Sequence, residues 1–422
     1  MRSMRWVRLG RSLGLLACTL AAATSLAAQQ PDTAPPPVPV ADSGSAAPAS
    51  AADADLITRT LVSRGFANVA TVVEGRRVFV TFENTRYRDL RRALHEVAAG
   101  LLPGADELVL VPSVDGVPLG TAWYGIEPGG NSAPASSSHQ TDARPRTSLS
   151  VAGLPPRLLS AHKASSSYGR VDVVVHPWFE ASFGDYDEPV RSRTGVAPEV
   201  RIALRRGLRL SAQVLFTLQD DLPTGESRVR PALLTLSQTV RLPRNVFVHA
   251  AAGAFTPNRY GADVQARAYS PSGRWFAGAE LAQTGVVSYA ENDWRRSPVE
   301  DRTALVEAGW RLLPTGLVVQ ATAGSFLGDQ RGVRLDVVRQ FGEVDFGGFV
   351  MTGEQGKNGG AILRIPIGPR RHPAPRPLRL RTADAFRWEY RYYGFVPGGR
   401  RFRTGNPLDD IGRWIDFAHH SH

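Results

Sequence analysis

Few side chains in this 422-residue sequence stand at the spacings that catalysis or metal binding requires. Three histidines crowd the last four residues, where an exposed tail explains them better than a metal site does. Asp409-Asp410 follows Pro407 and fits a helix-capping turn better than a sugar-nucleotide motif. His176 and His249 lack the carboxylate at fixed spacing that would make either a general base. The sequence therefore predicts no catalytic residue, no metal site, no cofactor and no enzymatic activity.

One short polar segment is a candidate contact site. Glu83, Asn84, Tyr87 and Arg88 could contact a saccharide or a partner protein. An N-terminal helix cap formed by Asn84 or Thr85 explains the same segment equally well.

The charge of the chain is basic but dispersed. The formal net charge is +11, and four of the positive charges lie within the first 11 residues. No run of five basic residues occurs, so binding of nucleic acid is poorly supported. The arginine excess could suit anionic polysaccharide or lipid head groups, although genomic base composition is the simpler explanation.

The N-terminus is typical of a secretory signal peptide, predicted over 1–28. Four arginines precede an apolar core rich in Leu and Ala, which ends in small residues. A membrane anchor is the alternative, but the apolar run is short. Cys18 is the only cysteine, so an intramolecular disulfide is impossible. Leu15-Leu16-Ala17-Cys18 matches a lipoprotein cleavage box, yet removal of Cys18 with the signal is favoured because cleavage there would leave a very short core.

The elements that would position these residues fall into two groups. Pro, Ala and Ser dominate 29–51, which predicts a disordered linker. Residues 52–125 predict a small α/β domain, and 126–165 predict a second linker. Because linkers flank it, we expect the small domain to be tethered and able to move. The expected helices and strands of this domain, in order, are helix 53–64, strands 69–73 and 78–82, helix 87–101, and strands 107–112 and 117–123.

From 166 to 368 the sequence alternates between apolar and polar residues with a period of two. In 210–218, for example, Leu210, Val214 and Phe216 alternate with polar residues that include Gln213. About twelve segments of roughly ten residues repeat this pattern, as expected for strands of a membrane β-barrel. Residues 369–422 then form a C-terminal extension, predicted to be a plug or a rim segment.

The strands of a soluble β-sandwich would also alternate between apolar and polar residues, and their charged side chains would point to bulk water. The signal peptide, the number of strands and the aromatic residues near strand ends favour the membrane. The predicted fold class is mainly β, a transmembrane antiparallel barrel of about 12 strands preceded by a small α/β periplasmic domain. The lipid-facing side chains are expected to be Leu210, Val214, Phe216, Val264 and Val337. The lumen-facing side chains are expected to be Gln213, Asp263, Arg267, Arg334 and Asp336.

Several stretches resemble the YjbH/GfcD family of exopolysaccharide-biosynthesis outer-membrane proteins. Arg64-Gly65-Phe66-Ala67-Asn68-Val69 is similar to the family's GF-x-NV turn, and 82–94 is similar to its EN-x-x-YR…AL segment. Gly347-Gly348-Phe349 and 360–367 resemble its closing strands. The resemblance implies a role in making or exporting an extracellular polysaccharide, without catalytic residues. Family members often carry what looks like a second barrel, for which this chain has no room.

The function expected from these observations is non-enzymatic assistance of exopolysaccharide or capsule biosynthesis or export, in the outer membrane of a Gram-negative-type bacterium. The expected partners are outer-membrane lipids, the exopolysaccharide and periplasmic or lipoprotein export partners, but not nucleic acid. A general porin-like solute channel is the alternative. An outer-membrane hydrolase or acyltransferase would need a Ser/His/Asp constellation that the sequence does not display.

Overall fold

The computed structural model describes residues 51–99, 105–125, 145–183, 190–222, 225–290, 293–391, 399 and 401–413. The predicted signal peptide and nearly all of the first predicted linker lie outside these residues, as do the C-terminal histidines. None of the helices in the described ranges is long and apolar enough to cross a membrane.

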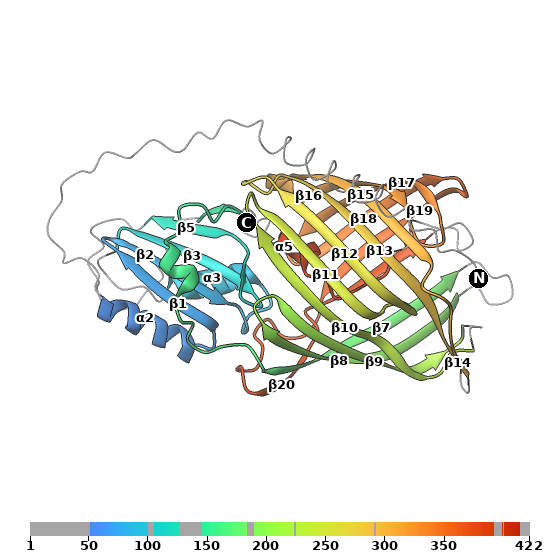
Figure 1. Ribbon diagram of the computed structural model, residues 1–422, viewed down its shortest axis with the longest axis horizontal. Helices are drawn as coiled ribbons and strands as arrows, with labels where there is room; N and C mark the ends of the chain where they lie inside the picture. Colours follow the sequence, from blue (N-terminus) through green and yellow to red (C-terminus); the bar gives the residue numbers. More distant parts are fainter. Residues whose placement is uncertain are drawn as a thin grey trace, which may run out of the picture.

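The N-terminal part is an α/β domain built on a six-stranded sheet (Figure 1). The strand order is β1-β2-β3-β5-β6, with β4 paired to β3. Strands β2 and β3 are parallel, so the chain crosses over between them through α3. The elements are α2 (Ala51–Ser63), β1 (Ala67–Glu74), β2 (Arg77–Glu83), α3 (Leu90–Ala98), β3 (Glu107–Val114), β4 (Val117–Pro118), β5 (Thr121–Gly125), β6 (Arg146–Ser148) and α4 (Pro156–Ser160).

Apolar side chains of α2, α3 and one face of the sheet form the main core of this domain, and the opposite face packs against residues around α4. Leu61 of α2, Phe82 of β2 and Leu94 of α3 are buried in one cluster. The chain can turn sharply after α2 because Gly65 has a φ of +91°, which a residue with a Cβ rarely adopts. The N-cap of α3 is Asp89, whose side chain accepts a hydrogen bond from the backbone N–H of Arg91.

The second predicted linker is wrong over its C-terminal part. Strand β6 pairs with β5, and α4 follows it. Leu149, Leu154 and Leu158 are buried around these elements. The few leucines among Ser and Pro residues are enough to dock this segment, although they do not form a periodic pattern. The strand expected over 117–123 is interrupted between β4 and β5, and the helix expected from 87 begins at Leu90.

The C-terminal part is a 15-stranded sheet, so the chain is mainly β as predicted. Its order is β20-β7-β8-β9-β10-β11-β12-β13-β15-β16-β17-β18-β19-β21, with β14 paired to β13. The strands are β7 (Val171–Phe183), β8 (Val190–Arg205), β9 (Leu208–Asp220), β10 (Val229–Leu242), β11 (Val246–Phe255), β12 (Arg259–Tyr269), β13 (Trp275–Ala290), β14 (Asp293–Arg296), β15 (Asp301–Leu312), β16 (Leu317–Ser325), β17 (Arg331–Phe341), β18 (Val344–Gly353), β19 (Gly356–Pro366), β20 (Leu378–Thr382) and β21 (Ala385–Arg391).

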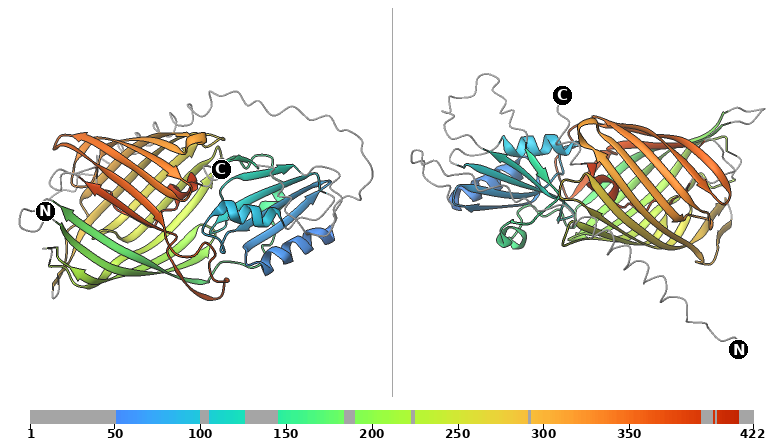
Figure 2. Two further views of the ribbon diagram at one scale, coloured as in Figure 1. Left: turned by 180° about the vertical axis from the view of Figure 1, so that it is seen from behind. Right: turned by 90° about the horizontal axis from the view of Figure 1, so that it is seen from above.

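The strands follow the chain order as an antiparallel meander that curls round on itself (Figures 1 and 2). The two ends of the order, β20 and β21, are separated in the chain by Ala383 and Asp384 alone. The edges of the sheet therefore meet at this point, although no ladder between β20 and β21 is present among the described residues. Two predictions need correction: the sheet continues beyond residue 368, and β20 pairs with β7 in parallel.

The two faces of the large sheet have the opposite polarity to that of a water-soluble sheet. Its outer face carries exposed aliphatic side chains, such as Leu236 at 49% and Val264 at 42% exposure. Its enclosed face carries buried charged side chains, such as Arg193 at 1% and Glu280 at 2% exposure. The charges are paired: Arg193 contacts Asp220, and Arg267 contacts Glu307.

The C-terminal segment 401–413 runs along the enclosed polar face and includes the short helix α5 (Leu408–Ile411) (Figures 1 and 2). Arg401 forms an ion pair with Glu280, and the ring of Phe402 stacks on Phe255 at 5.2 Å between centroids. Leu408 and Ile411 pack with side chains of both sheets in one cluster.

Candidate functional site

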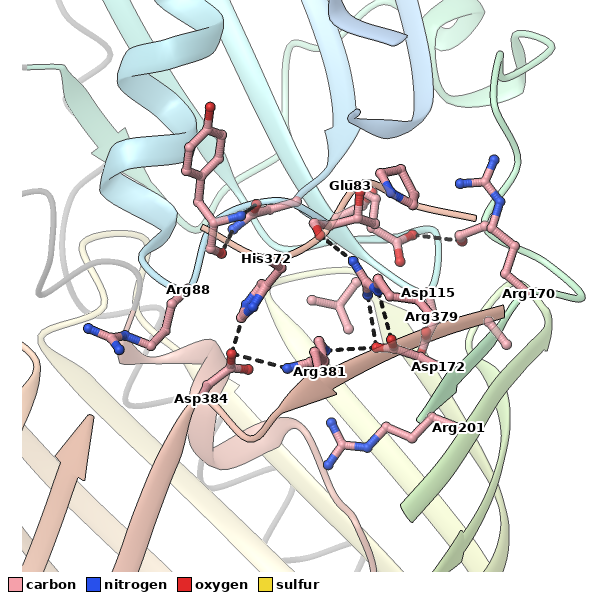
Figure 3. Close-up of a pocket in the computed structure, with 18 of the residues that line it drawn as sticks. Glu83, Arg88, Asp115, Arg170, Asp172, Arg201, His372, Arg379, Arg381 and Asp384 are labelled. Carbon is pink, nitrogen blue, oxygen red and sulfur yellow. Dashed lines mark hydrogen bonds and ion pairs between the residues drawn. The ribbon is translucent and has the colours of Figure 1, made fainter. Parts of the chain in front are cut away.

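A cavity of about 340 Å³ lies at the junction between the α/β domain and one rim of the large sheet (Figure 3). Residues from β2, β3, β7, β8, β20 and the segments around them line it. Its walls contain nine arginines and four carboxylates. The arginines are Arg88, Arg170, Arg201, Arg209, Arg364, Arg376, Arg379, Arg381 and Arg413, and the carboxylates are Glu83, Asp115, Asp172 and Asp384.

The turn between β3 and β4 anchors the α/β domain on this rim. The backbone N–H of Gly207 donates to the carbonyl of Asp115 at 2.8 Å. A guanidinium nitrogen of Arg209 lies 2.6 Å from the carboxylate of Asp115. Gly116 occupies the turn with a φ of +73°, and a Cβ there would clash with the hydroxyl of Tyr168. This turn therefore requires glycine for two independent reasons.

A second anchor is formed by the segment 85–88 of the α/β domain. The guanidinium of Arg86 donates to the carbonyl of His372 at 2.6 Å, and the N–H of His372 donates to the carbonyl of Arg86 at 2.7 Å. Arg88 forms a two-pronged ion pair with Glu343, with N–O distances of 2.5 and 3.0 Å. Bidentate pairs of this kind fix orientation as well as position.

Strand β20 contributes two arginines of the cavity wall, and carboxylates contact both of them. Arg379 donates to both carboxylate oxygens of Asp172 at 2.7 and 2.8 Å, and Arg381 donates to one of them at 2.9 Å. Arg381 also contacts Asp384, whose carboxylate lies 2.9 Å from Nε2 of His372. Figure 3 displays this chain of contacts, in which Asp172 and Asp384 contact Arg379, Arg381 and His372.

Glu83 is the carboxylate contributed by the α/β domain. Its Oε2 accepts hydrogen bonds from Asn68 at 2.6 Å, from Ser167 at 3.1 Å and from the backbone N–H of Gly116 at 3.2 Å. Burial, together with the nearby charge of Asp115, raises the pKa of Glu83 to about 7. The carboxyl group is therefore only partly ionised at neutral pH, which increases the net positive charge of the cavity.

The four residues predicted as a contact segment have different roles. Glu83 lines the cavity. Asn84 closes its own turn, because its side chain donates to the carbonyl of Tyr87 at 2.7 Å and accepts from the N–H of Tyr87 at 2.9 Å. Tyr87 is buried at 5% exposure, and Arg88 pairs with Glu343. The segment thus holds the α/β domain against the large sheet, whereas the flanking linkers predicted a tethered domain able to move relative to it.

The residues predicted to face a lumen lie apart from this cavity, on the enclosed face of the large sheet. Gln213, Asp263, Arg267 and Arg334 are buried, and Asp336 is half-buried. The guanidinium of Arg334 contacts the carboxylate of Asp336 at 2.7 Å. Of the residues predicted to face lipid, Val214, Phe216, Val264 and Val337 are exposed on the opposite face, and Leu210 is half-buried.

Sequence reasoning did not identify Arg379, Arg381 and Asp384 as parts of a site. The alternation Leu378-Arg379-Leu380-Arg381 was the available signal, because it is a short strand with both arginines on one face. No sequence pattern indicates that this strand pairs in parallel with β7, some 200 residues earlier in the chain. Within the described ranges, no three His, Cys, Asp or Glu residues are grouped so that they could hold a metal ion.

Comparison with known proteins gives one match. The family model described as exopolysaccharide biosynthesis protein YbjH (YjbH) matches residues 9–355, which include the α/β domain and the large sheet as far as β18. No match was found among curated proteins or among solved structures. Because the family model spans well over half of the sequence, the chain belongs to the YjbH family of exopolysaccharide biosynthesis proteins.

Proposed function

We propose that this chain is a non-enzymatic outer-membrane protein that assists the biosynthesis or export of an exopolysaccharide. In this proposal, the large sheet forms a barrel in the bilayer and the α/β domain lies in the periplasm. Membership of the YjbH family supports the role in exopolysaccharide biosynthesis. The membrane location is supported by the polarity of the sheet.

The main support for the proposal is that the outer face of the large sheet is apolar and its inner face is charged. Monomeric soluble proteins rarely expose large contiguous apolar patches, because exposed apolar area costs about 25 cal/mol per Å² in water. Here the exposed side chains near the middle of several strands are aliphatic, including Leu236 of β10, Val264 of β12 and Val306 of β15. Charged residues face inward instead. In membrane barrels, apolar side chains face the lipid and polar side chains face the interior.

The lengths of the connections support the orientation. At the rim next to the α/β domain, turns of two to five residues connect the strands, for example 206–207, 243–245 and 342–343. At the other rim, the connection 221–228 between β9 and β10 is longer. Bacterial barrels have short periplasmic turns and longer extracellular loops. This pattern supports a periplasmic position of the α/β domain, where an exported polymer would first meet the protein.

The C-terminal segment favours an assembly or guidance role over an open solute channel. Segment 401–413 occupies the enclosed face through ion pairs, including Arg401 with Glu280 and Arg413 with Asp345. The cavity wall is rich in arginine, a residue suited to binding and orienting anions, whereas hydrolysis or acyl transfer would need a nucleophile beside a general base. These features support a plugged, non-enzymatic protein.

Two measurements test this proposal. A strain that lacks the chain should secrete less exopolysaccharide, and the full-length chain should restore secretion; normal secretion without the chain would refute the role. In planar bilayers, the full-length protein should conduct little, and a variant that ends at residue 398 should conduct much more. Steady conductance of the full-length protein would instead favour the solute channel.

A further inference from the structure

We infer that the arginine-lined cavity binds an acidic saccharide, in which carboxylate groups on the sugar units pair with the cavity arginines. The inference rests on the proposed function, because it specifies the chemical class of the polymer that the protein handles. It rests on three features of the cavity: charge, fixed geometry and neutral hydrogen-bonding groups.

The charge of the cavity is positive even after its ion pairs are considered. Three of the nine arginines have carboxylate partners outside the lining: Arg88 pairs with Glu343, Arg201 with Glu199, and Arg413 with Asp345. Arg170 and Arg376 have no carboxylate within ion-pair distance among the described residues. Within the described ranges, the guanidinium of Arg170 contacts a neutral partner, the hydroxyl of Ser165 at 2.9 Å, and Arg376 is exposed. These two arginines are available to a ligand anion.

The geometry of the wall is fixed before any ligand binds. Asp172 holds Arg379 and Arg381, and Asp384 holds Arg381 and His372. These ion pairs fix the wall that surrounds Arg170 and Arg376, so little of it has to reorder when an anion binds, which favours affinity. Guanidinium groups also match carboxylates with two parallel hydrogen bonds. A cavity of about 340 Å³ lies at the small end of the usual range for ligand sites, so it would hold a short stretch of sugar rather than a folded chain.

The remaining lining suits sugar hydroxyls. The hydroxyl groups of Thr85 and Ser113 line the cavity. Each donates its hydrogen within the protein, to the carbonyls of Gly65 and Phe82, which leaves its oxygen as an acceptor for a sugar hydroxyl. A lipid fits less well than a saccharide. Its acyl chains would need the apolar outer face, whereas this cavity lies between the α/β domain and the rim of the large sheet. The position matches a polymer that passes from the periplasm along the junction of the two parts.

Binding of named probes to the full-length protein in detergent tests the inference. The acidic probe is trigalacturonate, the neutral probe is maltotriose, and the simple anion is inorganic phosphate. The variant is Arg170→Gln with Arg376→Gln. The control is Arg157→Gln with Arg228→Gln, which removes the same charge from two exposed arginines that do not line the cavity. Calorimetric titration gives the dissociation constants.

We expect trigalacturonate to bind the wild-type protein and the control alike. It should bind the cavity variant about tenfold or more weakly, because two charge-assisted hydrogen bonds are lost. Maltotriose should not bind measurably, and binding of trigalacturonate should weaken as salt is added. Equal binding of trigalacturonate to variant and wild type would overturn the inference, as would no binding at all. Phosphate binding as tight as trigalacturonate would also overturn it, in favour of a general anion or lipid-phosphate site.

The secretion assay separates this inference from the proposed function. A deletion strain that secretes normally would refute the function, whatever the cavity binds. A deletion strain that secretes little, complemented by a cavity variant that restores normal secretion, would refute only the acidic-saccharide site. We expect the cavity variant to insert normally and to restore much less secretion than the control variant.

Discussion

Substitution of Val264 by arginine tests how the large sheet meets its surroundings. Val264 is the sixth of the eleven residues of β12 and is 42% exposed on the outer face. Its cross-strand neighbours are Ala250 and Leu281, so no carboxylate lies opposite to pair with a new guanidinium. At the midplane of a bilayer, the substitution should lower the free energy of unfolding by about 2–4 kcal/mol. In water, an exposed substitution of this kind usually changes it by no more than about 0.5 kcal/mol.

Leu218→Arg is the matched control. Leu218 is 68% exposed and lies two residues before the end of β9. A cation near the membrane interface should cost only about 0–1 kcal/mol. The assay is reversible urea unfolding of the protein in phospholipid vesicles, followed by tryptophan fluorescence. The reasoning is refuted if Val264→Arg and Leu218→Arg unfold at the same urea concentration as the wild type.

Three further predictions concern the tail, the pH response and the anchoring turn. Arg401→Met should leave Glu280 as an uncompensated buried carboxylate, which typically costs about 3–5 kcal/mol. The C-terminal segment should then be cut faster by protease, and unchanged protection would contradict its role as a plug. Because the pKa of Glu83 is raised to about 7 from 4.5, the unfolded chain ionises first, and the α/β domain should lose stability as the pH rises from about 4.5 to 7. Hydrogen exchange of β1–β3 should detect this loss, and Glu83→Gln should abolish it; a wild type with no such pH dependence would disprove the assignment. Gly116→Ala should destabilise the docked domain by at least about 1 kcal/mol, since it adds strain at positive φ and a clash with Tyr168; unchanged exchange of the β3–β4 turn would contradict this.

The alternation of residues predicted the large sheet well because it depends on local physics alone. In β12, Asp263 and Val264 point to opposite faces because successive side chains of a strand alternate. The helix α2 and the hairpin β1–β2 were also predictable, since Gly65 and Glu74-Gly75 mark their ends. Their exact limits differ by a few residues from those predicted.

The junction between the two parts could not be predicted, because it depends on contacts between residues distant in the chain. Arg88 meets Glu343, and Arg379 meets Asp172, with no spacing rule to connect either pair. The composition of segment 145–165, which is rich in Ser and Pro, predicts a linker. Its few leucines nevertheless dock it against the sheet, and Leu149 joins a cluster that includes Phe247 of the large sheet. Contacts between residues distant in the chain therefore determine the structure of this segment, which its local composition does not predict.

The most direct test of a membrane-embedded sheet is to measure whether its outer face contacts lipid. A single cysteine can be placed at Leu236, the eighth of the fourteen residues of β10, or at Leu56 of α2, in a Cys18→Ser background. The two sites are matched in exposure at 49% and 44%. A fluorophore on each cysteine is then tested against nitroxide-labelled lipids in vesicles that contain the folded protein. The account predicts strong quenching at position 236 and little at position 56; little quenching at both positions would contradict a membrane-embedded sheet.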